Sequence, residues 1–308
     1  MERTVHDVLI VGGGPAGMAA ALVAGRARLS TVLFDAGEPR NAVTKASHGF
    51  LSRDGVAPVE LRRIGREQLG RYGTVRLHDG RVAGVSQLTD GFEVTHEDGT
   101  RWRGRRILLA TGHRAELAMP GIPDLEAVYG TSVFPCPFCD GFEHAGERIA
   151  VFASEMAGHM GPMLRVWTDD VVVFTNGRPL ADGLRQAFAS RGVGVEERPI
   201  VALDHDDGVL RAVRVDGASI PRDSGFVAEM HSAPATPFAE QLGVGAKLND
   251  WGLEVPDVTE DGSSSVKGVY VLGDARTGFS GVTGAANEGY ACMVGIVHAI
   301  ARERWEAA

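Results

Sequence analysis

The chain has 308 residues, a length that allows about two domains with substantial hydrophobic cores. Its composition is ordinary for a globular protein, and its net charge of −9 offers no basic surface for nucleic acid. No apolar run is long enough to cross a bilayer, and the polar residues 1–6 do not resemble a signal peptide. Three cysteines are too few for a secreted disulfide scaffold, so we expect a cytoplasmic enzyme that binds neither membranes nor nucleic acid.

Residues 5–37 have the pattern of a strand, a glycine turn, a helix and a second strand. Residues 8–11 form a short apolar run, which is typical of a strand covered on both faces. Residues 15–28 then change to alanine-rich helical character. This order of elements predicts the first half of a nucleotide-binding domain.

Three glycines, Gly12, Gly14 and Gly17, follow the first strand in the spacing GxGxxG. Glycine is needed there for the tight turn, for the approach of the backbone to a pyrophosphate, and for close packing of the helix on the strand. The N–H groups at the start of the helix then face the phosphates. Asp35 ends the second strand, where a carboxylate can accept hydrogen bonds from a ribose.

The next segment changes from helix to short strands. Residues 58–72 have the pattern of an exposed helix, with Pro58 near its start. Residues 74–109 alternate as short strands, separated by turn signals at Asp79-Gly80, Asp90-Gly91 and Asp98-Gly99. A buried strand ends at Thr111-Gly112, and a run of proline and glycine after it predicts a domain boundary near residue 115.

The middle of the chain repeats the design of its beginning, with a strand at 148–153, a helix at 156–167 and a strand at 171–175. Near the end, a strand at 268–272 stops at Gly273-Asp274 and a small-residue helix follows over 282–301. We therefore predict an α/β protein with two Rossmann-like domains of the three-layer ββα type. The first nucleotide-binding domain would comprise residues 1–115 and 244–308, and residues 116–243 would form an inserted second domain of related design.

The most specific motif is Cys-Pro-Phe-Cys-Asp-Gly at 136–141. Cys136 and Cys139 are spaced so that they can form and open a small disulfide ring. A zinc site would need about four ligands, and although His144 is a third candidate, no second cysteine pair follows, so we expect no metal. A static disulfide does not suit a reducing compartment. Asp140 is either a proton donor and acceptor for the thiols or a turn residue with Gly141.

The second glycine turn departs from the nucleotide-binding pattern. After the strand at 148–153 the chain has Ser154-Glu155-Met156 where a nicotinamide nucleotide site would carry glycines. A carboxylate at Glu155 would compete with a pyrophosphate for the helix N-terminus and repel it. Arg178 is a single arginine after the next strand, with no cluster around it for a 2′-phosphate. An unusual but functional turn is the alternative.

Together these motifs resemble the low-molecular-weight thioredoxin reductases over nearly the whole chain. The matching segments are VGGGPAG at 11–17, LLATG at 108–112, CPFCDG at 136–141 and VYVLGDA at 269–275. The resemblance implies a homodimer with FAD in the interrupted domain and a flavin that exchanges electrons with the disulfide. By position, the residues implied to contact FAD are Gly12, Gly14, Pro15, Ala16, Gly17, Asp35, Arg40, Asn41, Thr111, Gly112, Gly273 and Asp274.

The resemblance also assigns roles to the redox motif. Cys139 would face the flavin, Cys136 would engage the sulfur of the substrate, and Asp140 would be the acid–base residue. Two features depart from the reductases: the altered second turn, and Phe279-Ser280 in place of the family's Arg-Gln pair before the last helix. Both features speak against a nicotinamide donor and leave the flavin and dithiol motifs intact.

A subgroup of the family has this pattern, the dithiol oxidases that close disulfides in holomycin, gliotoxin or romidepsin. Membership would imply oxidation of a small-molecule natural-product dithiol, with O2 reduced to H2O2. A substrate thiolate would attack Cys136, release Cys139, and be displaced by the second substrate thiol. Three alternatives stay open: an NADPH-dependent disulfide reductase, a ferredoxin-driven reductase, and a redox-sensing flavoprotein without turnover.

Overall fold

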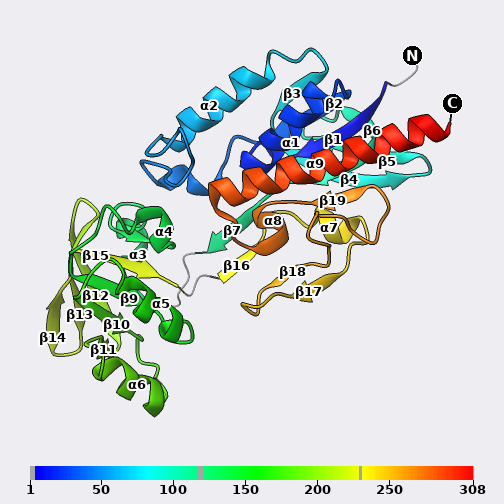
Figure 1. Cartoon of the computed structure of the whole chain (residues 1–308). Coiled ribbons are helices and arrows are strands. Elements are labelled where there is room, and N and C mark those ends of the chain that lie inside the picture. The colour runs from blue at the N-terminus through cyan, green and yellow to red at the C-terminus, as the bar shows by residue number, and fades with distance from the viewer. Residues whose placement is uncertain (1–3, 117–120, 229–230, 308) are drawn as a thin grey trace. The chain divides into compact units, whose positions relative to one another are not determined.

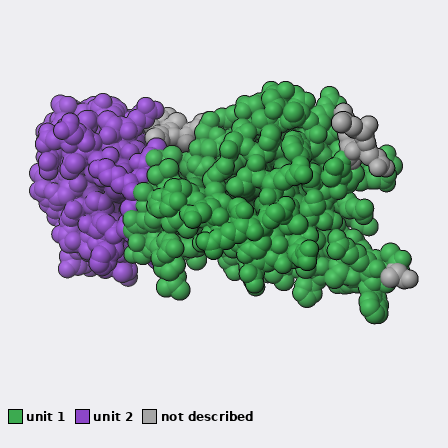
Figure 2. Space-filling model, turned by 90° about the horizontal axis from the view of Figure 1, so that it is seen from above, with its two compact units in different colours: residues 1–42, 50–114, 232–308 green, residues 43–49, 115–231 purple. Residues whose placement is uncertain are grey.

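In the computed structural model, residues 4–116, 121–228 and 231–307 are described. The chain forms two compact units, coloured separately in Figure 2. Unit 1 contains residues 1–42, 50–114 and 232–308, and unit 2 contains residues 43–49 and 115–231. Because unit 2 is almost wholly an insertion between two parts of unit 1, the chain leaves the first unit and returns to it.

Unit 1 contains most of the strands of the first third of the chain and the long C-terminal helix (Figure 1). Its elements, including those at its borders, are β1 (Val5–Val11), α1 (Pro15–Arg26), β2 (Thr31–Asp35), η1 (Arg40–Val43), α2 (Pro58–Leu69), β3 (Val75–Asp79), β4 (Val82–Leu88), β5 (Gly91–His96), β6 (Arg101–Leu109), β7 (His113–Glu116), β16 (His231–Pro234), α7 (Phe238–Gln241), β17 (Ala246–Leu248), β18 (Glu254–Pro256), β19 (Val269–Val271), α8 (Asp274–Thr277) and α9 (Gly281–Glu306).

The central sheet of unit 1 runs in the order β3-β2-β1-β6, and all of these neighbours pair in parallel. The end of β6 pairs in parallel with β19, whereas its beginning pairs antiparallel with β5, which continues to β4. One strand therefore serves both the nucleotide-binding sheet and a three-stranded meander. Successive residues of β1 alternate between the two cores of the unit, because side chains along a strand point to opposite faces.

The helices α1 and α9 pack against each other on one face of this sheet (Figure 1). Their approach is close at Gly289, where a Cβ atom would lie 2.0 Å from the carbonyl oxygen of Ala16. Any larger residue at that position would push α9 away from the first turn of α1. The small residues in both helices thus allow α9 to pack closely against α1, the helix that begins at the glycine turn.

Unit 2 repeats this design around a second parallel sheet, in the order β11-β10-β9-β15-β8. An antiparallel meander of β12, β13 and β14 forms a further sheet. The elements of the unit are α3 (Leu125–Val128), β8 (Val133–Phe134), α4 (Pro137–Asp140), β9 (Ile149–Phe152), α5 (Ala157–Leu164), β10 (Val171–Phe174), α6 (Asp182–Ala189), β11 (Gly194–Glu196), β12 (Ile200–Asp206), β13 (Val209–Val215), β14 (Ala218–Pro221) and β15 (Ser224–Val227).

The units divide the chain differently from the expected boundaries in two places. Residues 232–243 belong to unit 1, because Phe238 and Leu242 are buried in its core with residues of β1 and β2. Residues 43–49 belong to unit 2, where a Cβ atom on Gly130 would lie 2.8 Å from the carbonyl oxygen of Val43. Both differences come from contacts distant in sequence, which a local pattern does not reveal.

The predicted α/β class, with two Rossmann-like domains, is confirmed. Within the described ranges, no helix has the length and apolar character required to span a membrane.

Candidate active site

The glycine turn of unit 1 has the geometry that its spacing predicts. Gly12 has a φ of +113°, and a Cβ atom there would lie 2.1 Å from the carbonyl oxygen of Ala110. A Cβ atom on Gly17 would lie 1.9 Å from the carbonyl oxygen of Gly12. Neither position admits a side chain, because both distances are shorter than any contact that a Cβ atom makes. These two glycines are therefore required by the protein's own packing.

Gly14 differs, since a Cβ atom at this residue would meet no protein atom within 4 Å. It is the N-cap residue of α1, it has no side chain to occupy the helix end, and Pro15 follows at the first helical position. The first turn of α1 also carries no acidic residue. The first N–H groups of this 12-residue helix thus have no capping side chain and no acidic neighbour in the first turn, which fits a pyrophosphate. Ala16 continues this turn and is buried.

Asp35 is buried at the end of β2, as its predicted role requires, and it has partners that the sequence did not indicate. Arg62 and Arg66 of α2 donate to its carboxylate at 2.6 and 3.0 Å. Burial acts to raise the pKa of Asp35, but the N–H of Gly37 and the two guanidinium groups outweigh it and lower the pKa. The carboxylate is therefore ionised and can accept ribose hydroxyl groups.

Gly13 is a further residue that sequence reasoning missed. A Cβ atom at this position would lie 2.2 to 2.5 Å from atoms of the Asp35 side chain. Only glycine lets the turn approach this carboxylate so closely. The middle glycine of the run Gly12-Gly13-Gly14 was the available signal.

Asp274 is held by a clamp made from two distant loops of unit 1. Arg40 lies 2.9 Å from the Asp274 carboxylate and donates to the carbonyl oxygen of Gly278 at 3.0 Å. Its guanidinium carbon lies 4.8 Å from the centre of the Phe279 ring, within cation–π range. The N–H of Ser280 donates to the other carboxylate oxygen at 2.7 Å. Arg40, Phe279 and the N–H of Ser280 thus orient the carboxylate expected to contact FAD.

The remaining predicted cofactor residues lie on neighbouring turns of unit 1. Gly273 precedes α8 with a φ of +63°, and its N–H donates to Glu288 at 2.8 Å. Thr111 and Gly112 follow β6, where Gly112 has a φ of +75°. Asn41 lies in η1, next to Arg40. The structure places these residues on the turns that follow β6, β19 and β2.

The redox motif forms the short helix α4 of unit 2. Cys136 is its N-cap residue and is buried, whereas Cys139 is half-buried one turn later. The N–H groups of Cys139 and Asp140 donate to the carbonyl oxygen of Cys136 at 3.1 and 3.2 Å. A Cβ atom on Gly141 would lie 2.5 Å from the carbonyl oxygen of Pro137, so glycine is required after Asp140. All three cysteines are free thiols.

The surroundings of Cys136 favour its thiolate. The thiol of Cys139 donates to Cys136, and the N–H groups of Cys139 and Phe138 add to this effect. Together they lower the pKa of Cys136 to about 7, although burial and the charge of Asp140 act in the opposite direction. A thiol with this pKa is substantially ionised at neutral pH and is both a good nucleophile and a good leaving group.

Asp140 has the opposite shift. Burial raises its pKa to about 6, with nearby Glu143 acting in the same direction and His48 and His144 partly opposing them. A carboxyl group with this pKa exchanges protons near neutral pH, which suits an acid–base residue beside a dithiol. Glu143 in turn lies 3.6 Å from His48.

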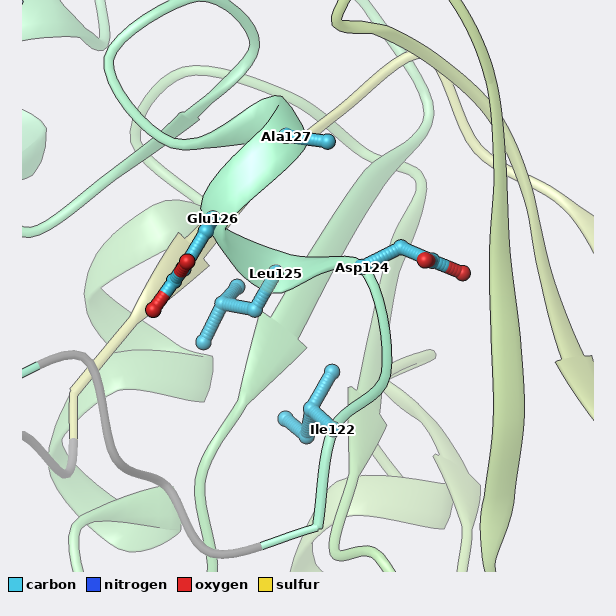
Figure 3. A pocket seen from close by; sticks show the side chains of 5 residues that line it. All are labelled: Ile122, Asp124, Leu125, Glu126 and Ala127. Carbon is cyan, nitrogen blue, oxygen red and sulfur yellow. The ribbon is translucent and has the colours of Figure 1, made fainter.

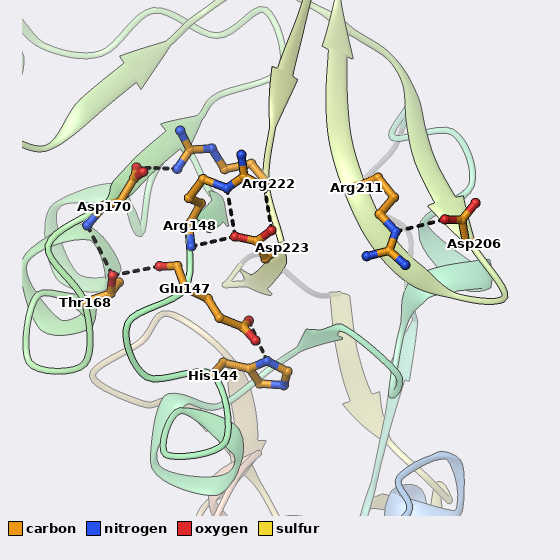
Figure 4. A network of polar contacts seen from close by, with 9 residues as sticks. All are labelled: His144, Glu147, Arg148, Thr168, Asp170, Asp206, Arg211, Arg222 and Asp223. Carbon is orange, nitrogen blue, oxygen red and sulfur yellow. Dashed lines mark hydrogen bonds and ion pairs between the residues drawn. The ribbon is translucent and has the colours of Figure 1, made fainter.

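A polar network anchors the segment that follows the redox motif (Figure 4). His144 contacts the Glu147 carboxylate at 2.8 Å, so the only third ligand considered for zinc has an acidic partner instead. The carbonyl oxygen of Glu147 accepts a hydrogen bond from Thr168 at 2.7 Å. Arg148 pairs with Asp223 at 2.6 Å. These contacts connect the loop after α4 to the beginnings of β9 and β15.

The second nucleotide-type turn has no glycine between β9 and α5. Ser154 is buried, Glu155 is exposed, and Met156 is the N-cap residue of α5 without a capping side-chain bond. Arg178, the single arginine after β10, donates to the Ser154 hydroxyl at 3.2 Å. Its side chain is directed to the turn itself.

Unit 2 also has an open cavity of about 570 Å³ that contains none of the predicted site residues. Figure 3 shows that α3 and the turn before it line this cavity, through Ile122, Asp124, Leu125, Glu126 and Ala127. It has no thiol and no basic group among these lining residues. Cys292 lies elsewhere, in α9 of unit 1, where burial raises its pKa to about 12 and makes it unreactive.

Comparisons with known proteins identify the family of this chain. Residues 6–289 match the profile described as pyridine nucleotide-disulphide oxidoreductase. The chain is a member of this family. It is 33% identical to thioredoxin reductase tcpT of Claviceps purpurea over 93% of this chain and 91% of that protein. It is 30% identical to thioredoxin reductase aclD of Aspergillus oryzae, covering 98% of each chain. The solved structure of HlmI superposes with a TM-score of 0.89 at 32% identity, covering 99% of this chain and 97% of that one.

Family membership confirms the resemblance to thioredoxin reductases, the FAD cofactor and the identity of the protein as a flavin-dependent oxidoreductase. The turn at Gly14, the ionised Asp35 and the clamped Asp274 fit this cofactor, since they offer an anion site and two acceptors for hydroxyl groups. The individual FAD contacts stay predictions.

Proposed function

We propose that this oxidoreductase is a dithiol oxidase, which closes an intramolecular disulfide in a small-molecule dithiol while O2 is reduced to H2O2. The observation that carries the proposal is the second turn, Ser154-Glu155-Met156, in a chain whose FAD turn and dithiol are complete. An acidic residue beside the N-terminus of α5 opposes a pyrophosphate, so the usual electron donor is disfavoured.

The residues of the redox motif account for the thiol chemistry. In the oxidised enzyme, a substrate thiolate attacks Cys136, a substrate–enzyme disulfide forms, and Cys139 leaves as a thiolate. The second substrate thiol, after losing its proton to Asp140, displaces Cys136 and closes the product disulfide. The substrate loses two electrons and two protons, and the enzyme disulfide becomes a dithiol. Bound FAD supplies the acceptor for these two electrons and their route to O2.

The pKa values of Cys136 and Asp140 support these roles, although Cys136 is more buried than Cys139. Cys136 is the leaving group in the resolving step, and its pKa of about 7 favours that departure. Asp140, with a pKa of about 6, is the nearby group that can take a proton from a thiol at neutral pH.

We also propose that the protein is a homodimer. Light scattering on the FAD-loaded protein tests this.

The relatives in Claviceps purpurea and Aspergillus oryzae are named thioredoxin reductases, which favours a second candidate, an NADPH-dependent disulfide reductase. Peroxide formation separates the two functions. The FAD-loaded enzyme is incubated in air with dithiothreitol as the probe dithiol, and H2O2 and oxidised probe are quantified. The oxidase predicts equal amounts of both products without NADPH. A reductase predicts neither beyond the rate of free FAD.

A further inference from the structure

A cluster of three possible metal ligands lies in unit 1, apart from the residues assigned to flavin and dithiol chemistry. His78 is in β3, His96 ends β5, and Asp98 is in the turn after β5. One ligand-type atom from each of the three lies within 4.8 Å of the others. The side chain of His96 is buried and that of Asp98 is half exposed, so the cluster opens to solvent on one side.

His96 is held in the orientation of a metal ligand. Its Nε2 atom lies 3.1 Å from the carbonyl oxygen of Asp79, and because a carbonyl only accepts, Nε2 carries the proton. Metal-binding histidines commonly donate their second N–H in this way. Gly80 permits the approach, since a Cβ atom there would lie 2.4 Å from Nε2.

The other nitrogen of His96 then faces a negative group. In a neutral ring Nδ1 is left with a lone pair, and it lies 3.0 Å from Oδ1 of Asp98. Nδ1 accepts a long hydrogen bond from the N–H of Asp98 at 3.4 Å, but its nearer neighbour is the carboxylate oxygen. Two acceptors 3.0 Å apart are favourable only with a proton or a metal ion between them. The N–H and the hydroxyl group of Thr100 donate to the same carboxylate oxygen of Asp98 at 2.8 and 2.7 Å and hold it in this position.

His78 distinguishes between a proton and a metal. Its Nε2 atom is buried and has no hydrogen-bond partner among the described residues. Its ring contacts three other rings, those of Phe34, His96 and Trp102, with centres 5.7, 4.3 and 5.3 Å away. A proton on His96 leaves this nitrogen unsatisfied, whereas a metal ion bound through Nε2 of His78 would satisfy both histidines.

We propose that His78, His96 and Asp98 form a binding site for a divalent metal ion of the zinc class. Two imidazoles and one carboxylate suit zinc, with water in the fourth position. A bound ion would fasten the end of β3 to the β5–β6 hairpin. It would also act near the FAD turn, because Asp79 pairs with Arg66 at 2.6 Å and Arg66 pairs with Asp35.

Zinc binding to the FAD-loaded protein tests the proposal. The parent protein for the test is Cys136→Ser/Cys139→Ser, which removes the thiols as competing ligands. After chelator treatment and dialysis, Zn2+ is titrated in by calorimetry and bound metal is measured after gel filtration. We expect saturation at one Zn2+ per chain and a rise in the unfolding temperature on binding.

Further substitutions in this parent identify the ligands. His78→Gln, His96→Gln and Asp98→Asn should each weaken binding by about 100-fold or more, because each removes a ligand rather than an outer-shell partner. His298→Gln, an exposed histidine of α9, is the matched control and should bind zinc like the parent. Asp98→Asn lies on the surface, so it stays informative if a histidine variant fails to fold. A parent without stoichiometric zinc, or undiminished binding in Asp98→Asn and the histidine variants, would overturn the proposal.

Discussion

The guanidinium of Arg178 donates a hydrogen bond to the hydroxyl of Ser154, 3.2 Å away, across the ends of two neighbouring strands of unit 2. In a nucleotide-binding domain these strand ends face the pyrophosphate and the adenosine ribose. Here the one arginine that follows β10 is bonded to the turn that follows β9. This relationship, together with Glu155, is the physical basis for expecting no productive NADPH site.

Neutralising Glu155 tests the electrostatic part of that expectation. In Glu155→Gln, the rate of anaerobic flavin reduction by NADPH should rise about fivefold, which corresponds to about 1 kcal/mol of repulsion removed near a helix N-terminus. Stopped-flow measurement of flavin absorbance gives the rate. Glu126→Gln, an exposed glutamate on α3, is the matched control. Equal rates in the two variants would show that the Glu155 charge is not the obstacle.

The cysteine pair should be indispensable and the third cysteine dispensable. Cys136→Ser and Cys139→Ser should each reduce dithiol oxidation to the rate of free FAD, since neither can form the enzyme disulfide. Cys292→Ala should keep nearly full activity, because burial in α9 raises the pKa of Cys292 to about 12 and keeps it from reacting. Oxygen consumption with dithiothreitol measures all three. Activity that survives in both serine variants would exclude the proposed thiol exchange.

Asp140→Asn should lower activity and raise stability. Its removal as an acid–base group should reduce the rate of dithiol oxidation by about 10²- to 10⁴-fold. Wild-type activity should rise with pH through about 6 as the carboxylate ionises, and the variant should lack this limb of the pH–rate profile.

The stability effect follows from the same pKa. Burial raises the pKa of Asp140 from 3.8 to about 6, so between these values the folded protein binds more protons than the unfolded chain. Wild-type stability therefore falls as the pH rises through this window. Asparagine has no such loss, and the variant should unfold at a higher temperature above pH 6. If Asp140→Asn were less stable and its activity still rose with pH through about 6, Asp140 would have only a structural role.

Two glycines of the FAD turn should respond differently to alanine. Gly17→Ala should destabilise the protein with or without FAD, because its Cβ atom would lie 1.9 Å from the carbonyl oxygen of Gly12. Gly14→Ala should destabilise the apoprotein far less, by about 1 kcal/mol at most, since its Cβ atom would meet no protein atom and only the N-cap residue changes. It should nevertheless weaken FAD binding if the pyrophosphate lies there. Thermal unfolding of both apoproteins and titration with FAD give the comparison. An unaltered FAD affinity in Gly14→Ala would show that the pyrophosphate does not bind at Gly14.

Much of the fold follows from local patterns. The strands, the glycine turns and the helices α1, α2 and α9 lie within a few residues of their predicted bounds, because periodicity and turn residues act over short distances. The meander of unit 2 was not predicted, although Asp207-Gly208 and Asp216-Gly217 give its turns the same signal as in unit 1. That residues 232–243 belong to unit 1 follows only from the burial of Phe238 and Leu242 in its core, which no local pattern indicates.

The candidate site divides in the same way. Motif residues such as Cys136 and Asp35 could be predicted from the sequence, because their position relative to neighbouring motif residues indicates their chemical role. Arg62 and Arg66 are not, since they reach Asp35 from a helix about 30 residues later and only folding brings them together. The contact between His78 and His96 likewise depends on tertiary packing, because β3 and β5 are not neighbouring strands in the sheet.

The central claim is that this flavoenzyme takes electrons from a dithiol and not from NADPH. An anaerobic titration of the FAD-loaded protein, followed by flavin absorbance, tests it directly. The account predicts that dithiothreitol bleaches the flavin, that NADPH does not, and that air restores the colour with formation of H2O2. Prompt bleaching by NADPH would contradict the account and identify the enzyme as a reductase.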